Sequence, residues 1–497
     1  MRTALIAKRG STAVWALLLG TSLLYFFSVN EADNDLWGHL LFGREILAAG
    51  AIPRVDTFTY TAGGHPWMNH EWLSQVVLAA TYQWGGSPGL LLLKFTVAAT
   101  TCLLLFALIR RRTDAPYLWG AVGLLVIAVL ARGFAMRPQI FTYLGTALTL
   151  WLLSCHQRGR YGALWFFPLL FVIWANLHGG FILGLGILGL FAGAELVHAP
   201  QYRARLGLAV IASAAATLFN PYGPKLLVYV WTELQSVHPI TEWQRAVPAD
   251  VAQFAFFAML GVFVLTLPCR RDWRQRGWEA LLALGVGLLA LRHQRHTPVF
   301  AVCAAVPLAT QLQSAKDWLA RRSPFALSAS GQRLIAGAVV ALASLQLCFT
   351  GLRYHRDGLQ IVFDPSDYPT AAVRTIREAN VQLNLAVPLG WGEYVLWFLA
   401  PRVKVSLDGR FATVFSERVI RDNFDFFSGA PTWRHLVDDY PTQAALVPVA
   451  APCPIRREAG WRRVYGDTVA EVYVRTDRAP SLLLGAASGQ PPPAIFP

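Results

Sequence analysis

Long apolar runs recur along the first 351 residues, and they constrain the fold more than any other feature of the sequence. The hydrocarbon core of a bilayer is about 30 Å thick, so a helix that crosses it needs about 20 apolar residues. Charged residues make up only 14% of the chain, whereas soluble proteins average about 25%. We therefore expect an all-α polytopic membrane domain with about 11 transmembrane helices, at 11–29, 88–109, 117–133, 137–155, 162–177, 180–198, 204–219, 251–268, 278–292, 297–312 and 333–351.

Two segments near the N-terminus need a separate interpretation. Arg2, Lys8 and Arg9 precede the apolar run 12–29 as in a signal peptide, but no small-residue cleavage site follows it. We interpret this segment as a retained signal anchor. The apolar run 71–84 has only about 14 residues, which fits an interfacial or re-entrant helix better than a full span.

The distribution of Lys and Arg predicts the orientation of the spans. With the N-terminus in the cytoplasm, the inner segments carry 18 basic residues, and the outer loops before residue 352 carry eight. This asymmetry follows the positive-inside rule and indicates a multi-pass protein of the bacterial inner (plasma) membrane. It explains most of the net charge of +14, so we predict no nucleic-acid partner. An odd number of spans places the C-terminal residues on the extracytoplasmic side.

The composition changes near residue 354, where the apolar runs end. We predict strands at 385–387, 403–407, 444–449 and 469–474, and helices at 364–380, 391–399 and 417–427, with Ser366 or Asp367 as the N-cap of the first. Strands mixed with helices indicate a small C-terminal α/β extracytoplasmic domain. The predicted division is a transmembrane domain at 1–352 with a long first outer loop at 30–87, the α/β domain at 353–477, and a disordered tail at 478–497.

The first outer loop carries the candidate catalytic residues. Asp35 and His39 are four residues apart and share one face of an expected helix, so they can act as a base and its partner. Asp33 is the better placed of the two aspartates to cap this helix, so we assign a catalytic role to Asp35. His70 and Glu71 add a second imidazole and carboxylate further along the same loop. Together these four residues also form an alternative divalent-metal site.

Two short basic loops fall on the predicted outer side. One contains Arg132 and Arg137, and the other contains Arg292 and Arg295. The planar guanidinium group of arginine matches the oxygens of phosphate, so we expect these four residues to bind a phosphate at the membrane surface. Contact with lipid headgroups at the outer interface is the alternative.

These features resemble the GT-C superfamily of integral-membrane glycosyltransferases, which use polyprenyl-phosphate-linked sugars. Asp35-Leu-Trp37 with Arg44 and Gly50 is similar to the first-loop motif of oligosaccharyltransferase catalytic subunits. The stretch 390–394, Gly-Trp-Gly-Glu-Tyr, followed by Asp408 and Gly409, resembles their WWDYG…DN pattern. Gly392, Glu393 and Val395 stand in place of its second Trp, its Asp and its final Gly. The number of spans and the outer domain are equally similar to protein mannosyltransferases and aminoarabinose transferases.

The resemblance implies a membrane glycosyltransferase with a GT-C-like fold and an inverting mechanism. Asp35 would deprotonate the acceptor, and Arg137 with Arg292 or Arg295 would hold the leaving polyprenyl phosphate. His70 and Glu71 would line the pocket or complete a metal site, and Trp391, Glu393 and Tyr394 would lie on the acceptor side. The acceptor, a lipid, a glycan or a protein, remains open at this stage.

Three other functions remain compatible with the sequence. A polysaccharide polymerase or ligase uses the same lipid phosphates, but it more often has a large late outer loop than a long first one. A transporter of a lipid-linked substrate also needs a polar cavity, although transporters place ionisable groups near the midplane of the membrane. A non-catalytic scaffold with an external interaction domain is the third.

Overall fold

The computed structural model describes residues 2–198, 200–233, 241–322, 328–477 and 495–496. The chain divides into two compact units. The first unit comprises Met1–Asn30 and Leu91–Leu359, and the second comprises Glu31–Leu90 and Gln360–Pro497. The predicted first outer loop is thus grouped with the C-terminal residues, whereas the sequence assigned it to the transmembrane domain.

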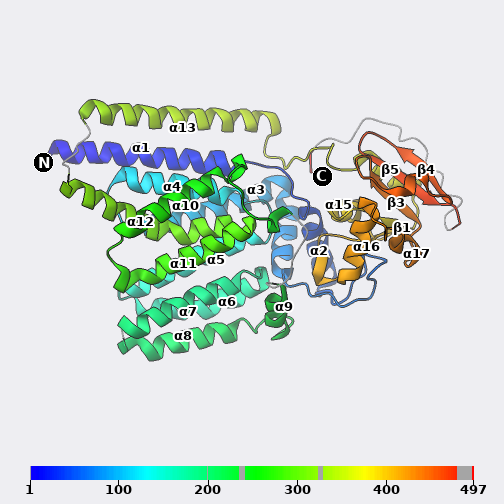
Figure 1. Ribbon diagram of the computed structural model, residues 1–497, viewed down its shortest axis with the longest axis horizontal. Helices are drawn as coiled ribbons and strands as arrows, with labels where there is room; N and C mark the ends of the chain where they lie inside the picture. Colours follow the sequence, from blue (N-terminus) through cyan, green and yellow to red (C-terminus); the bar gives the residue numbers. More distant parts are fainter. Residues whose placement is uncertain (1, 199, 234–240, 323–327, 478–494, 497) are drawn as a thin grey trace. The chain divides into compact units, whose positions relative to one another are not determined.

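The first unit consists of helices that run side by side (Figure 1). Helix α1 (Arg2–Phe27) packs along α13 (Ala329–Asp357). Helix α12 (Thr297–Arg322) packs against α4 (Pro116–Ala131), α10 (Phe254–Thr266) and α11 (Trp273–Arg292). Each of the eleven predicted spans coincides with a helix of this unit. They are α1 (Arg2–Phe27), the second part of α3 (Trp72–Arg110), α4 (Pro116–Ala131), α5 (Gln139–Gln157), α6 (Phe166–Leu177), α7 (Phe181–His198), α8 (Arg203–Ala216), α10 (Phe254–Thr266), α11 (Trp273–Arg292), α12 (Thr297–Arg322) and α13 (Ala329–Asp357); the short α9 (Lys225–Glu233) lies between α8 and α10.

The apolar length of these helices supports a multi-pass membrane protein. Among the described residues, six helices are long and apolar enough to cross a membrane. Two shorter apolar helices, Pro116–Ala131 and Tyr161–Leu177, accompany them. The prediction of an all-α polytopic domain is therefore confirmed.

Helix α3 is interrupted where the sequence separates the short run 71–84 from the span 88–109. Gly86 has φ 55° and ψ −149°, which are not helical angles. A positive φ at this point favours glycine, because a side chain would be strained there. Pro88 follows and cannot donate a backbone hydrogen bond. The two apolar runs therefore form separate helices, as predicted.

A buried ion network lies at the predicted cytoplasmic ends of several helices. Glu279 of α11 accepts from Arg112 at 2.5 Å, and it lies 3.4 Å from Arg270 and 3.6 Å from Arg276. These arginines belong to the 18 basic residues of the predicted inner segments. Arg112 and Arg270 are largely buried, so they hold helices α3 and α11 and the loop between α10 and α11 together.

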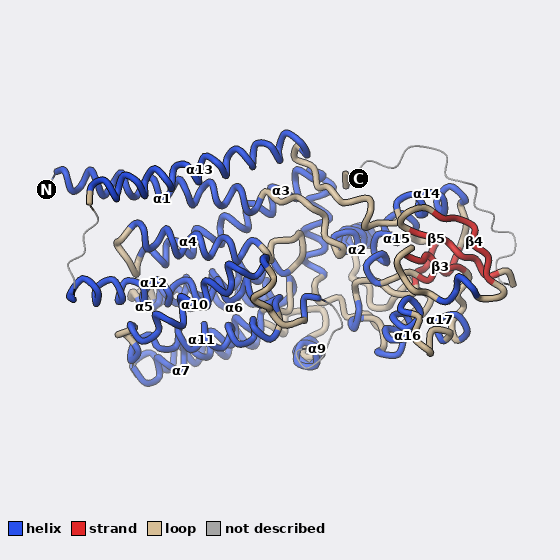
Figure 2. The backbone as a smooth tube through the Cα atoms, turned by 45° about the horizontal axis from the view of Figure 1, so that its top comes forward, coloured by secondary structure: helices blue, strands red, loops and turns tan. Residues whose placement is uncertain are grey.

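The second unit contains a five-stranded mixed sheet, with strands drawn in red in Figure 2. The strand order is β2-β1-β3-β5-β4, with β1 parallel to β2 and β3, and β5 antiparallel to β3 and β4. The elements are α2 (Leu36–Ala49), α14 (Thr370–Ala379), β1 (Leu383–Ala386), α15 (Leu389–Leu399), β2 (Val403–Val405), α16 (Glu417–Ser428), α17 (His435–Asp438), β3 (Ala444–Pro448), β4 (Trp461–Gly466) and β5 (Ala470–Arg475). The prediction of a small C-terminal α/β domain is confirmed.

Two details of this unit differ from the prediction. Strand β4 was not predicted, because it is an edge strand whose side chains are mostly half-buried or exposed. Helix α14 begins at Thr370 rather than at 364. Asp364 accepts a hydrogen bond from the backbone N–H of Ser366 at 2.8 Å, and this local turn competes with the helix. Pro369 further disfavours a helical conformation at Tyr368.

The segment after α1 is built into this sheet. Thr59 forms a parallel bridge with Val405, with backbone hydrogen bonds from Tyr60 to Val405 and from Val405 to Phe58, each 3.2 Å long. Ala32 donates to Val362 at 2.7 Å. The bonds at Val405 extend the β2 edge, and together with the bond at Val362 they explain why 31–90 and the C-terminal residues form one unit.

Helix α2 is anchored by aromatic packing around Trp37, which is fully buried. Its ring lies 4.9 Å from that of Tyr394 in α15 and 4.1 Å from that of Phe496, which it stacks against. Phe496 belongs to the predicted disordered tail 478–497, of which residues 478–494 and 497 lie outside the described residues. The packing around Trp37 fixes the start of α2, where the candidate base Asp35 lies.

Candidate functional site

Asp35 is the N-cap residue of α2, but its carboxylate forms no capping hydrogen bond with the helix. The carboxylate of Asp33 forms a local hydrogen bond instead: its Oδ1 accepts from the backbone N–H of Asp35 at 3.0 Å. His39, one turn further on, is buried, and its N–H donates to the carbonyl oxygen of Asp35 at 3.0 Å. Asp35 thus occupies the N-cap position that was predicted for Asp33, while the carboxylate of Asp33 accepts from the N–H of Asp35.

A carboxyl group from the other end of the chain reaches the start of the same helix. The N–H of Gly38 donates to Oε2 of Glu393, from α15, at 3.0 Å. A Cβ atom on Gly38 would lie 2.1 Å from Cδ of Glu393. Position 38 is therefore limited to glycine, because any side chain would displace the glutamate.

Two further glycines bring the surrounding backbone close to this carboxyl group. A Cβ atom on Gly409 would lie 2.6 Å from Oε1 of Glu393 and 3.0 Å from Oδ1 of Asp35. A Cβ atom on Gly392 would lie 2.2 Å from the carbonyl oxygen of Leu407. The two carboxyl groups thus converge on Gly409, between α2, α15 and the loop after β2.

The surroundings of Glu393 favour its neutral form. Burial raises the pKa of Glu393 well above its usual value, and the nearby carboxylates of Asp35 and Asp408 raise it further. The hydrogen bond from Gly38 and the charge of Arg410 oppose this effect without cancelling it. The protonated form of Glu393 is therefore favoured, as it is for other buried carboxyl groups beside carboxylates.

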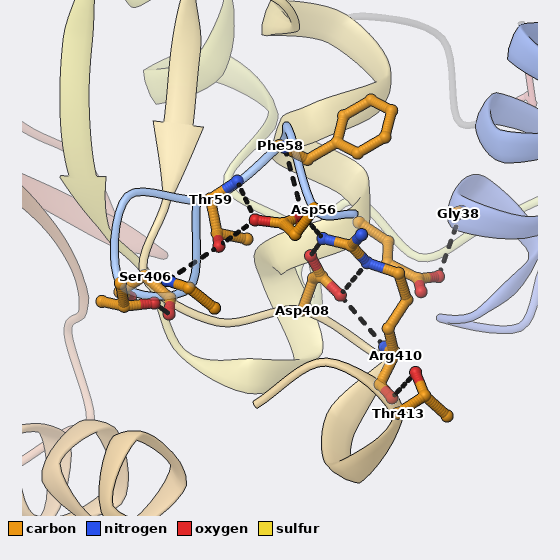
Figure 3. A network of polar contacts seen from close by, with 11 residues as sticks. Gly38, Asp56, Phe58, Thr59, Ser406, Asp408, Arg410 and Thr413 are labelled. Atoms are coloured by element: carbon orange, nitrogen blue, oxygen red, sulfur yellow. Dashed lines mark hydrogen bonds and ion pairs between the residues drawn. The ribbon is translucent and has the colours of Figure 1, made fainter. Parts of the chain in front are cut away.

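Arg410 fixes the loop that carries Gly409, through the contacts drawn in Figure 3. Its Nη2 lies 2.6 Å from Oδ1 of Asp56 and 2.7 Å from Oδ2 of Asp408, and its Nε donates to Asp408 at 2.9 Å. The side chains of both aspartates are fully buried. Although burial alone would lower the pKa of Arg410, the two carboxylates raise it, so the guanidinium group stays charged.

Aromatic rings enclose the same guanidinium group. Its Cζ lies 4.9 Å from the ring centre of Phe42, 5.3 Å from that of Phe58 and 4.6 Å from that of Trp67. Such rings attract a cation through their negative faces. Asp56 also accepts from Thr59 Oγ1 at 2.6 Å, which orders the loop that follows α2 (Figure 3).

The other predicted residues of this unit have different surroundings. Nε2 of His70 lies 3.7 Å from Oε1 of Glu71, just before α3. Within the part of the chain that the structure describes, no three His, Cys, Asp or Glu side chains form a group that could hold a metal ion. Asp35, His39, His70 and Glu71 are thus not gathered into such a group in this structure.

The residues predicted to face the acceptor are buried. Trp391 donates from Nε1 to the carbonyl oxygen of Asp367 at 2.7 Å, and Tyr394 packs against Trp37. Glu393 points to Gly38. These contacts give the three residues a role in packing and in holding α2.

The predicted phosphate-binding arginines belong to the first unit. Arg137 pairs with Glu242, and Arg295 lies over the ring of Trp243 with its Cζ 4.6 Å from the ring centre. Glu242 and Trp243 are neighbours in one short helix (Thr241–Trp243), which brings Arg137 and Arg295 to the same place. Arg132 and Arg292 are exposed.

Several residues of both sites were not identified as functional candidates from the sequence. No sequence motif marks Asp56, Arg410 or Trp243. Glu242 was not identified from the sequence either, and Asp408 appeared only as part of the resemblance. A spatial contact between residues more than 300 positions apart gives no local signal in a single sequence.

Comparisons with known proteins support the fold. No protein-family model matches the chain, and no curated protein matches its sequence. A solved structure of ArnT from Cupriavidus metallidurans, described as bound to undecaprenyl phosphate, matches with a TM-score of 0.53 and 12% identity. The match covers 96% of this chain and 99% of that chain. This similarity supports the GT-C-like fold implied by the resemblance.

The close approach of Gly392 in α15 to the backbone of Leu407 can be tested by measuring stability. Gly392→Ala should lower the free energy of unfolding by about 1–3 kcal/mol, because its Cβ would meet the backbone oxygen of Leu407. Gly390→Ala is the matched control on the same helix, since the nearest atom to its Cβ is 3.6 Å away. Alanine should there be neutral or slightly stabilising. Thermal unfolding of both detergent-solubilised variants measures the difference, and equal losses would contradict the close approach.

Proposed function

We propose that this protein is an inverting membrane glycosyltransferase that transfers a sugar from a polyprenyl-phosphate-linked donor to an acceptor. The observation that carries the proposal is the pair of carboxyl groups, Asp35 and Glu393, at the start of the first loop of a GT-C-like fold. Asp35 matches the position of the acidic residue that the family resemblance assigns as the catalytic base. The sugar and the acceptor, which is a lipid, a glycan or a protein, are left undefined by this proposal.

In this mechanism Asp35 acts as the general base. The acceptor oxygen or nitrogen attacks the anomeric carbon of the sugar while the bond from that carbon to the phosphate oxygen breaks. Asp35 takes the proton that the acceptor loses. Attack from the side opposite the leaving phosphate inverts the anomeric centre.

The arginine cluster of the first unit would stabilise the leaving group. Negative charge grows on the polyprenyl phosphate as the bond to the sugar breaks, and positioned guanidinium groups stabilise this charge. Arg137 and Arg295 are the two residues best placed to act together, with the exposed Arg132 and Arg292 as further contacts. Glu242 neutralises Arg137 while no phosphate is bound, so the phosphate has to compete with this carboxylate.

The proposal places the reaction on the outer face of a bacterial inner membrane. The excess of basic residues on the predicted inner segments supports a cytoplasmic N-terminus and an extracytoplasmic C-terminal unit. The apolar helices contact membrane lipids, and the polyprenyl chain of the donor would lie against them.

A cysteine-labelling experiment tests this orientation. Cys453 is a poor reporter, because it is buried and burial raises the pKa of its thiol to about 11. Ser428→Cys places a thiol at an exposed position of the second unit and should react with a membrane-impermeant reagent in intact spheroplasts. Arg158→Cys, exposed at a predicted inner loop, should react only after lysis. Both variants are made with Cys348→Ser, since Cys348 is exposed, and the reverse pattern of labelling would reject the orientation.

The second experiment tests the base. Asp35→Asn keeps the size of the side chain but cannot accept a proton, so sugar transfer should fall by about 10²- to 10⁴-fold. Binding of the donor should remain. Asp33→Asn, whose oxygen can still accept from the N–H of residue 35, should cost only stability. Transfer from a lipid-linked donor is measured for both, and near-normal transfer by Asp35→Asn would rule out this role.

The third experiment tests the phosphate site. Arg137→Ala should weaken binding of undecaprenyl phosphate by about 1.5–3 kcal/mol, as expected for a lost hydrogen bond to a charged group. Arg158→Ala, at an exposed position on the predicted inner side, is the control and should have no effect. Arg112 is unsuitable as a control because it is buried against Glu279. If both variants bind the lipid equally well, Arg137 is an ordinary contact with lipid headgroups.

A further inference from the structure

The charges around Gly409 do not balance if every carboxyl group is ionised. Asp35, Glu393 and Asp408 lie together, and Asp56 joins them through Arg410. Arg410 is the cation that the structure pairs with Asp56 and Asp408. Its charge is already shared by two carboxylates, so a negative Asp35 and a negative Glu393 would have little compensation in a buried place. Such pairs of carboxyl groups retain a proton.

The groups that face Glu393 come from two neighbouring elements. Helix α2 contributes the carboxyl group of Asp35 and the N–H of Gly38, and the loop after β2 contributes Asp408 and Arg410. On α14, which also packs against α15, the charged groups Arg374 and Arg377 act on Tyr394. The charge balance at Glu393 is therefore set by α2 and the loop after β2.

We propose that Glu393 is a positioning residue that remains a neutral carboxylic acid and shares its proton with Asp35. This inference rests on the proposed role of Asp35 as the base. The shared proton keeps Asp35 ionised and fixes one of its oxygens. The other oxygen is then directed towards the acceptor.

The hydrogen-bond geometry assigns the proton to one oxygen of Glu393. Oε2 accepts from the N–H of Gly38, so this oxygen acts as an acceptor. A Cβ atom on Gly409 would lie 2.6 Å from Oε1 of Glu393 and 3.0 Å from Oδ1 of Asp35, so both oxygens approach the same side of Gly409. Oε1 is thus the oxygen of Glu393 on the side of Asp35, and the proposal assigns the shared proton to it; bonds between an acid and a carboxylate are short and strong.

The arrangement predicts a particular pH dependence. Since the pKa of Glu393 is raised, its proton is present below that pKa and is lost as the pH rises through it. Loss of the proton leaves two negative groups facing each other and removes the hydrogen bond that orients Asp35. Transfer should therefore decline on the alkaline side of its optimum because of Glu393. The two groups titrate as a coupled pair, so the decline reports the pair.

Substitutions of Glu393 test the role of its proton through activity. Glu393→Ala should lower transfer at neutral pH by about 10- to 100-fold, because Asp35 loses its donor. Glu393→Gln keeps an N–H donor that cannot ionise, so it should restore a large part of this loss and shift or remove the alkaline decline. Glu378→Gln makes the same chemical change at an exposed position of α14 and should keep the parent profile. If Glu393→Gln transfers as poorly as Glu393→Ala, or keeps the alkaline decline, the proposal is overturned.

An infrared titration decides the question without any transfer assay. The parent protein at neutral pH should show the carbonyl stretch of a protonated carboxyl group. This band should disappear in Glu393→Gln and persist in Glu378→Gln, and it should fade from the parent as the pH is raised. If the parent shows no such band, or if Glu393→Gln keeps it, the proposal is overturned. Because this readout needs no substrate, it separates failure of the shared proton from failure of the proposed glycosyl transfer.

Discussion

The buried guanidinium group of Arg410 is the interaction on which the second unit depends. It joins Asp56 from the segment after α2 to Asp408 from the loop after β2, and aromatic rings shield it from water. Removing one partner of such a buried ion pair leaves an uncompensated charge, which is far more costly than losing a surface pair. The position of Gly409 follows from this network, and Gly409 is where Asp35 and Glu393 meet. The arrangement of the candidate catalytic groups is thus determined by a residue that is not itself assigned to the chemistry.

The two arginine environments in this chain differ in a way that fits their proposed roles. Arg410 is paired with two buried carboxylates and is itself almost completely buried, so a ligand that arrives from solution cannot reach it. Arg137 pairs with Glu242, which is partly exposed, and Arg295 rests on Trp243. A paired but accessible arginine can exchange its carboxylate for a phosphate at little cost, because the charge remains compensated throughout. This distinction supports the first unit, and not the buried Arg410, as the place for the lipid phosphate.

The sequence predicted most of the fold, because its strongest signal is local. A run of apolar residues is a property of one segment, so the spans and the break before Pro88 could be recognised without knowledge of their neighbours. Strand β4 was not predicted, because the edge of a sheet tolerates polar side chains and its sequence therefore lacks an apolar strand pattern. The site was only partly predictable: Asp35 was identified from its position, but its contact with Glu393 joins residues 358 positions apart. Arg112 was interpreted as a flanking charge because sequence cannot show that Glu279 lies opposite it.

The departures of this chain from the WWDYG pattern have a physical reason. A second Trp cannot replace Gly392, because even a Cβ atom there would lie 2.2 Å from the carbonyl oxygen of Leu407. Glutamate at 393 is one methylene longer than aspartate, and its carboxyl group reaches Gly38 on the helix that follows Asp35. The motif of this chain therefore faces inwards, towards the proposed base, and the side chains of Trp391, Glu393 and Tyr394 are buried. Their predicted place on the acceptor side stays a prediction, and a preference for peptide acceptors does not follow from the resemblance.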